Sequence, residues 1–265
     1  MEVGICKLCL EDKPLCDSHL VPSALYKMCA KGGKLISLNS KTIKVAEGEV
    51  SFPLLCSDCE QRLSKDGENW LLPKLANKDR TFPLYDILVT GTPDAVFDGR
   101  AAYACSRIDN FAFRKITNFA IGIFWKASVH SWKPDVRKTR IDLGRYREQF
   151  RLFLLNKGPF PKNATLSVGV SPPQDATSTF NLPHLTHKHP HFSYLQVIPG
   201  MVFVLNVGNR LCPEDRDTCF FSNPIHPLIV RNMRDRIDAH FRSNFKDSVM
   251  TDEVKELGKK FGYKG

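Results

Sequence analysis

Two Cys-x-x-Cys pairs decide the fold of the first part of this chain: Cys6-Lys7-Leu8-Cys9 and Cys56-Ser57-Asp58-Cys59. The two-residue spacing lets one tight turn place two thiolates at adjacent corners of a tetrahedron. Two such pairs are the usual ligand set of a structural zinc ion. We therefore expect one Zn²⁺ to be bound by Cys6, Cys9, Cys56 and Cys59. The alternative is a set of buried free thiols.

The residues around the two pairs indicate a hairpin followed by a helix. Residues 60–65 have a helix-forming composition, so the second pair lies at the start of a helix. The first pair lies in a turn, and strand-like stretches follow at 35–43 and 50–55. A pair in a hairpin turn combined with a pair at a helix start predicts a treble-clef module.

Two further motifs extend this pattern. Asp17-Ser18-His19-Leu20-Val21-Pro22 reads polar-His-aliphatic-aliphatic-Pro, and Leu55-Cys56-Ser57-Asp58-Cys59-Glu60 leads into the helix. Together with the first cysteine pair, this layout resembles the zinc-stabilised HNH (ββα-metal) endonucleases over about residues 4–75. It is also similar to a group of bacterial proteins with a SHIIP-like segment and an LCxxCE segment.

The resemblance implies a mechanism. In HNH enzymes the strand histidine takes a proton from the water that attacks the scissile phosphate, and one divalent metal stabilises the developing charge. His19 matches this histidine, while Glu60 occupies the helix position that usually holds Asn or His. Glu68 lies eight residues further on. The resemblance thus implies His19, Glu60 and Glu68 as the catalytic residues, with Mg²⁺ or Mn²⁺.

Three positions depart from the family's pattern. Ser18 stands where the family often has an acidic or histidine metal ligand. Asp17 would replace that ligand only if the strand bulged, because adjacent residues face opposite sides of a strand. The Asn expected before the second pair is absent from residues 47–52. The alternative function is therefore a catalytically inactive, zinc-dependent module that binds nucleic acid or protein.

The charge of the chain favours a polyanionic partner. The 265 residues include 38 Lys and Arg against 28 Asp and Glu, which gives a net charge of +10 and a pI near 9.2. Phosphate contacts release counterions and give affinity regardless of base sequence, although a basic solvated surface is the alternative reading. We expect DNA rather than RNA, contacted by Lys27, Lys31, Lys34, Arg62 and Lys65.

The cysteine count and the chain start indicate a compartment. Nine cysteines, an odd number, with no export signal at residues 1–4, predict reduced thiols in the cytoplasm. No apolar run approaches the roughly 20 residues of a membrane span, so no membrane partner is expected. A role in bacterial defence against phage is an expectation that rests on analogy at the level of the fold.

Two other clusters leave alternatives open. Cys16 lies three residues before His19, which is a ligand-like spacing, although a buried thiol is the simpler reading. His184–His191 holds four of the eight histidines, and Pro183 and Pro190 predict a loop. This loop could bind a metal, contact phosphate or serve only as surface. No glycine-rich phosphate loop or nucleophile elbow is present.

We expect two domains and an α+β fold: a zinc-binding HNH-like module at 1–78 and a larger α+β domain at 79–265. Apolar residues at helical spacing predict a central helix over 108–131. The remaining expectations are a strand-like run at 85–90, a helix at 143–156, strands of a small sheet at 164–170, 194–198 and 201–207, a helix at 229–245, and a charged terminal helix or frayed end at 252–263. This domain is expected to grip substrate, sense a ligand, or bind a protein partner or a second copy of the chain.

Overall fold

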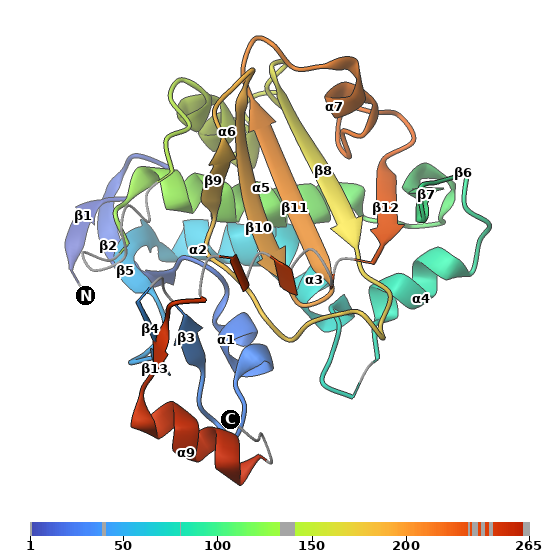
Figure 1. Ribbon diagram of the computed structural model, residues 1–265. Coiled ribbons are helices and arrows are strands. Elements are labelled where there is room, and N and C mark those ends of the chain that lie inside the picture. Colours follow the sequence, from blue (N-terminus) through green and yellow to red (C-terminus); the bar gives the residue numbers. More distant parts are fainter. Residues whose placement is uncertain are drawn as a thin grey trace.

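The computed structural model confirms a mixed α+β fold, built from three β-sheets and the helices packed on them (Figure 1). It describes residues 2–261 except 39–40, 80, 133–140, 233, 235–237, 240–241 and 244–245.

The first sheet carries both cysteine pairs and has the strand order β1-β2-β5. Strands β1 (Val3–Ile5) and β2 (Asp12–His19) form a hairpin whose turn holds Cys6 and Cys9. Strand β5 (Ser51–Cys56) pairs antiparallel with β2 and ends at Cys56, which caps helix α2 (Ser57–Leu63). The expected hairpin turn and helix start are therefore both present.

One helical stretch continues from α2 through a π-helical segment, η1 (Ser64–Glu68), into α3 (Asn69–Leu71) and the short 3₁₀ helix η2 (Leu72–Lys74). Gly67 lies in η1 and does not end the helix. A Cβ atom at this position would lie 2.9 Å from the backbone nitrogen of Phe119. The missing side chain therefore lets η1 approach helix α5 at backbone distance.

The central sheet has seven strands in the order β6-β7-β12-β8-β11-β10-β9. Its pairs are antiparallel except for β12 with β8, which run parallel. Strands β8 and β11 are almost wholly buried, as expected for the centre of a sheet. The bounds are β6 (Ala95–Phe97), β7 (Arg100–Ala104), β8 (Ala164–Val170), β9 (His184–His187), β10 (Phe192–Ile198), β11 (Met201–Val207) and β12 (Pro227–Arg231).

Helix α5 (Phe113–Val129) is the central helix that the sequence predicts, and every residue from Ile116 to Ser128 is buried. It crosses behind the central sheet in Figure 1, between the strands and the α2–α3 stretch. Helix α6 (Tyr146–Leu154) packs against it. One hydrophobic core includes residues from Cys6 to Val230 and so joins the cysteine-bearing sheet to the central sheet. The expected division at residue 78 stays a prediction.

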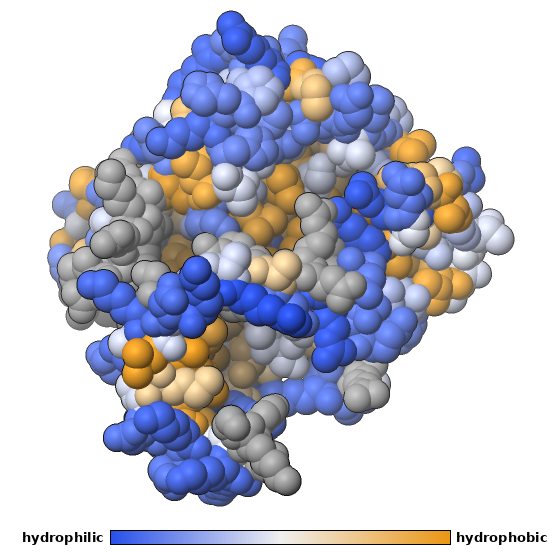
Figure 2. Space-filling model, in the orientation of Figure 1, coloured by the Kyte–Doolittle hydropathy of each residue, from blue (hydrophilic) through white to orange (hydrophobic). Residues whose placement is uncertain are grey.

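The third sheet brings the end of the chain back to its beginning. Strands β3 (Ile36–Leu38) and β4 (Thr42–Val45) form a hairpin, and β13 (Val249–Met250) pairs with β4 in parallel. The helices α1 (Ser23–Cys29) and α9 (Asp252–Lys260) flank this sheet. Figure 2 shows apolar side chains over the position of the third sheet and hydrophilic ones over α9.

Several expected elements differ in the structure. Residues 85–89 belong to a helix, α4 (Pro83–Val89), which Thr90 follows as the C-cap, because Pro83 can occupy its first turn and Leu84 and Leu88 are buried one turn apart. The expected helix at 229–245 begins as strand β12; of the residues after it, 234, 238–239 and 242–243 are helical and most others lie outside the described residues.

The histidine segment is partly a strand, β9, because His184 to His187 pair with β10. The central sheet is larger than the small sheet expected, since β6, β7, β9 and β12 join the three predicted strands. The short helices η3 (Cys105–Arg107) and α7 (Pro213–Asp217) complete the described elements. None of the described helices is long and apolar enough to cross a membrane.

The close approach of η1 to α5 predicts that two glycine substitutions change the free energy of unfolding in opposite directions. Gly67→Ala should destabilise the protein by roughly 1–3 kcal/mol, because its Cβ would overlap the α5 backbone. Gly122→Ala, also helical, meets only Leu63 at 3.8 Å and should stabilise by up to about 1 kcal/mol. Urea denaturation of both variants checks this; equal effects would contradict it.

Candidate metal centre and the adjoining acid-base cluster

The four cysteines of the two pairs meet at one point. The sulfur atoms of Cys6, Cys9, Cys56 and Cys59 all lie within 4.8 Å of one another, and all but Cys9 are buried. Two thiolates bound to one tetrahedral zinc lie about 3.8 Å apart, given Zn–S bonds of about 2.3 Å. The sulfurs of Cys9 and Cys56 are 3.9 Å apart. This donor set is compatible with a structural zinc ion.

The surroundings of the cluster favour a thiolate even without a metal. The Cys6 sulfur accepts hydrogen bonds from the Cys59 thiol and from backbone N–H groups, including that of Cys56 at 3.3 Å. These contacts lower the pKa of Cys6 to about 4, against the opposing effect of burial. The pKa of Cys59 is raised, chiefly because its thiol donates a hydrogen bond to the Cys6 sulfur. Binding of a metal would therefore release protons.

His19 ends strand β2, and a carboxylate holds its ring. The Nε2 atom of His19 lies 2.7 Å from Oε2 of Glu49, and both side chains are about one-third exposed, at 34% and 30%. The other oxygen of Glu49 accepts a hydrogen bond from Ser23 Oγ at 3.0 Å. Glu49 is thus fixed on both oxygens, and the imidazole is oriented while it stays open to solvent.

A buried lysine fixes the backbone of the same residue. Lys126 comes from the interior of α5 and is only 2% exposed. Its Nζ atom donates a hydrogen bond to the carbonyl oxygen of His19 at 2.6 Å. A buried ammonium is costly unless it is paired, so this lysine is expected to lie near a negative charge.

Glu68, on the helical stretch that follows the second cysteine pair, supplies that negative charge. Burial raises the pKa of Glu68, while the nearby positive charges of Lys126 and His19 oppose the rise and the negative charge of Glu60 adds to it. Glu68 therefore lies in electrostatic range of Lys126, Glu60 and His19.

The π-helical segment accounts for this convergence. Residues eight apart in a regular α-helix are turned by about 80° relative to each other. Because a π-helical turn takes up one extra residue, Glu60 and Glu68 are placed as residues seven apart would be, on the same side. One oxygen of Glu60, Oε1, is buried and has no hydrogen-bond partner among the described residues.

Within the described part of the chain, the cysteines are the one group of three or more candidate ligands whose donor atoms are gathered closely enough for a metal. His19, Glu60 and Glu68 do not meet that condition, and the catalytic role of all three stays a prediction. Ser18 is buried and accepts a hydrogen bond from the Leu55 backbone at 3.1 Å.

Strand β5, not β2, carries the irregularity that Asp17 would need. The register shifts between Cys16 and Asp17, whose partners are Leu55 and Pro53, so the extra residue is Leu54. Asp17 is exposed and accepts a hydrogen bond from Ser51 Oγ at 2.9 Å. It therefore does not take the place of Ser18, whose side chain is buried.

The other predicted residues separate into two groups. Cys16 lies outside the cysteine cluster, and burial, more than nearby charge, raises the pKa of its thiol. The five basic residues expected to contact nucleic acid are all exposed, namely Lys27, Lys31, Lys34, Arg62 and Lys65. Two of them also contact the C-terminal segment: Lys34 pairs with Glu253 at 2.6 Å, and Lys31 lies over the Phe261 ring.

Two residues of the cluster were not identified from the sequence. Glu49 lies within residues 47–52, where the Asn of the family's pattern is absent. The available signal was an acidic side chain just before strand β5, which pairs with the strand of His19. Lys126 lies in an otherwise apolar helix, where a lone charged residue indicates a buried partner. The partner itself could not be found without the fold.

Comparison with known proteins adds no relative: no family model, no curated protein and no solved structure matches this chain.

The cysteine cluster predicts the metal content of the protein. We expect one zinc per chain, and Cys56→Ser should lose it and destabilise the fold by on the order of 3 kcal/mol or more. Cys16→Ser is the matched control, because Cys16 neighbours the cluster without belonging to it, and it should keep the zinc. Elemental analysis and thermal denaturation check both variants; full zinc content in Cys56→Ser would contradict the assignment.

Proposed function

We propose that this protein is a nuclease of HNH-like type, which hydrolyses phosphodiester bonds with His19 as general base on a zinc-stapled, treble-clef-like module. One observation carries the proposal. A partly exposed histidine on the strand between the two cysteine pairs is paired with Glu49, and it lies in electrostatic range of Glu68, as do Glu60 and the buried Lys126. Charged groups gathered around an acid whose pKa is raised, here Glu68, are typical of functional sites.

The contacts of His19 assign a role to each ring nitrogen. The Nε2 atom faces Glu49 at 2.7 Å, and a carboxylate accepts hydrogen bonds there. A neutral imidazole with its proton on Nε2 has an unprotonated Nδ1, which can take the proton of an attacking water. Glu49 would also stabilise the imidazolium that forms, and Lys126 holds the backbone of His19 in place.

The carboxylates of Glu60 and Glu68 are the residues that would hold the expected Mg²⁺ or Mn²⁺. Two buried or half-buried acids close to each other repel, and the unpartnered Oε1 of Glu60 is an oxygen that a cation would satisfy. When bound, such a cation would neutralise charge that develops on the phosphate.

Nucleic acid is the proposed substrate because of the charge of the chain and the exposed lysines around the module. DNA is proposed ahead of RNA, and defence against phage is the proposed setting. The second candidate function is a catalytically inactive module that binds nucleic acid or protein. The second candidate is favoured because, within the described residues, His19, Glu60 and Glu68 are not gathered closely enough to form a ready-made metal site.

The nuclease proposal predicts the effect of removing the base. His19→Ala should lower cleavage of plasmid or single-stranded DNA in Mg²⁺ or Mn²⁺ by about 10² to 10⁴-fold, the usual contribution of a general base. Zinc content should not change. His187→Ala, an exposed histidine on β9, is the control and should cleave normally. Cleavage by His19→Ala at the parent rate would eliminate His19 as the base; binding without cleavage by the parent would favour the second candidate.

Glu49 should act through His19. Glu49→Gln keeps the shape but removes the charge, so we expect kcat to fall on the order of tenfold while KM changes little. Glu47→Gln is the matched control, because that carboxylate lies two residues away, pairs with Lys44 at 2.5 Å and is exposed. Steady-state kinetics on an oligonucleotide substrate separate the two; equal kcat values for both variants would contradict the role of Glu49.

A further inference from the structure

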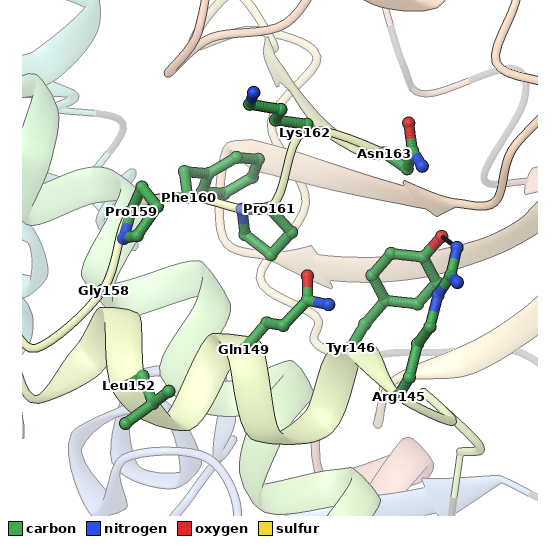
Figure 3. Close-up of a pocket in the computed structure, with 10 residues that line it drawn as sticks. All are labelled: Arg145, Tyr146, Gln149, Leu152, Gly158, Pro159, Phe160, Pro161, Lys162 and Asn163. Carbon is green, nitrogen blue, oxygen red and sulfur yellow. Dashed lines mark hydrogen bonds between the residues drawn. The ribbon is translucent and has the colours of Figure 1, made fainter.

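A cavity of about 400 Å³ lies between helix α6 and residues 158–163, on the opposite side of α6 from the cysteine turn (Figure 3). Its volume falls within the range of small-molecule sites in proteins. The two sides of the helix are distinguished by their contacts. Arg151 points to the cysteine turn and donates a hydrogen bond to Leu8 O at 2.6 Å, whereas Arg145 and Gln149 line the cavity.

Two aromatic rings line the cavity and are held by packing. Tyr146 and Phe160 are 8% and 7% exposed, so most of each ring is packed and only an edge can meet a ligand. Phe160 makes edge-to-face contacts with Phe150 and Phe153 of α6, at centroid distances of 5.7 and 5.4 Å. Prolines precede and follow Phe160. Aromatic edges held in this way suit an aromatic ligand, because edge-to-face contacts are a preferred geometry of ring pairs.

The polar lining is cationic or neutral. Arg145 and Lys162 lie at the edge of the cavity, Gln149 extends from α6 toward the Phe160 side in Figure 3, and none of the lining residues carries a carboxylate. The guanidinium is held in place, since Arg145 Nη2 donates to Asn209 Oδ1 at 2.6 Å and to the Tyr146 hydroxyl at 3.2 Å.

This edge is ordered before any ligand binds. Asn163 Nδ2 donates to the same Asn209 oxygen at 3.1 Å, which links the two sides of the cavity through one amide. A third cation lies close by, because Arg216 Nη1 donates to the backbone oxygen of Lys162 at 3.4 Å. An arginine fixed by neutral partners keeps its charge and its remaining donors for an anion.

We propose that this cavity binds a nucleobase joined to a phosphate group. The base would lie against the exposed edges of Phe160 and Tyr146, the Gln149 amide would contact the hydrogen-bonding edge of the base, and the phosphate would lie beside the Arg145 guanidinium. A ligand with this chemistry comes from two sources, a free mononucleotide or the terminal nucleotide of a single strand. The proposal is independent of nuclease activity, since it uses no residue of the His19 cluster.

The first experiment measures binding by isothermal titration calorimetry with the full-length, zinc-loaded protein. The probes are the four nucleoside 5′-monophosphates, the matching nucleosides, ribose 5-phosphate and inorganic phosphate. We expect saturable binding of at least one monophosphate, and weaker binding of its nucleoside and of ribose 5-phosphate. Equal binding of inorganic phosphate and the monophosphate, or no binding of any monophosphate, would overturn the proposal.

Variants then locate the site. Arg145→Ala should weaken binding by about tenfold, as the loss of a charge-assisted hydrogen bond does. Gln149→Trp should abolish binding by filling the cavity from an exposed helix position. Lys157→Ala is the matched control, because Lys157 is an exposed cation next to the lining residues but not among them, and its affinity should equal that of the parent. Parent-like affinity in Gln149→Trp, with unchanged circular dichroism, would place the ligand elsewhere and overturn the assignment.

A final arm distinguishes the two sources. An oligonucleotide with a 5′-phosphate and one without it are compared with the free monophosphate. The zinc-loaded protein is kept in buffer that contains neither EDTA nor added Mg²⁺, so that the zinc stays bound and no cleavage occurs. Tighter binding of the phosphorylated strand, lost in Gln149→Trp, identifies a strand end. Binding of the monophosphate alone identifies a free nucleotide, and either result supports the shared chemistry.

Discussion

The convergence of four sulfur atoms is the constraint on which the N-terminal part of the molecule depends. A turn between two short strands and the first turn of a helix have little apolar area of their own to hold them together, and strand β1 is mostly exposed. Bringing Cys6 and Cys9 to Cys56 and Cys59 fixes the angle between the hairpin and helix α2. The direction of β2, and with it the position of His19, follows from that angle.

The local parts of this arrangement could be predicted from the sequence, because they depend on spacing alone. The cysteine ligand set, the hairpin turn, the helix start and the buried central helix were all expected, and the structure contains them. Strands β8, β10 and β11 also follow from their apolar runs. The zinc itself, the nuclease activity and the nucleic-acid partner stay predictions.

Long-range pairing explains what could not be predicted. The spacing of Leu84 and Leu88 fits a strand or a helix, and Pro83 favours the helix because it can occupy the first helical turn. Residues 227–231 became a strand because β7 and β8 were available on either side. Glu49 and Lys126 reach His19 from positions 30 and 107 residues away, and the π-helical turn that aligns Glu68 with Glu60 has no local signature in the sequence.

The return of the chain end to the third sheet has a consequence for how the protein is made. Strand β13 pairs with β4, about two hundred residues earlier in the chain, and α9 packs beside it. A ribosome delivers the N-terminal segment first, so β4 emerges long before its partner exists. The hairpin of β3 and β4 must wait with one edge open until residues 249–250 have been synthesised. The third sheet is thus completed only after the two hundred or so intervening residues have left the ribosome.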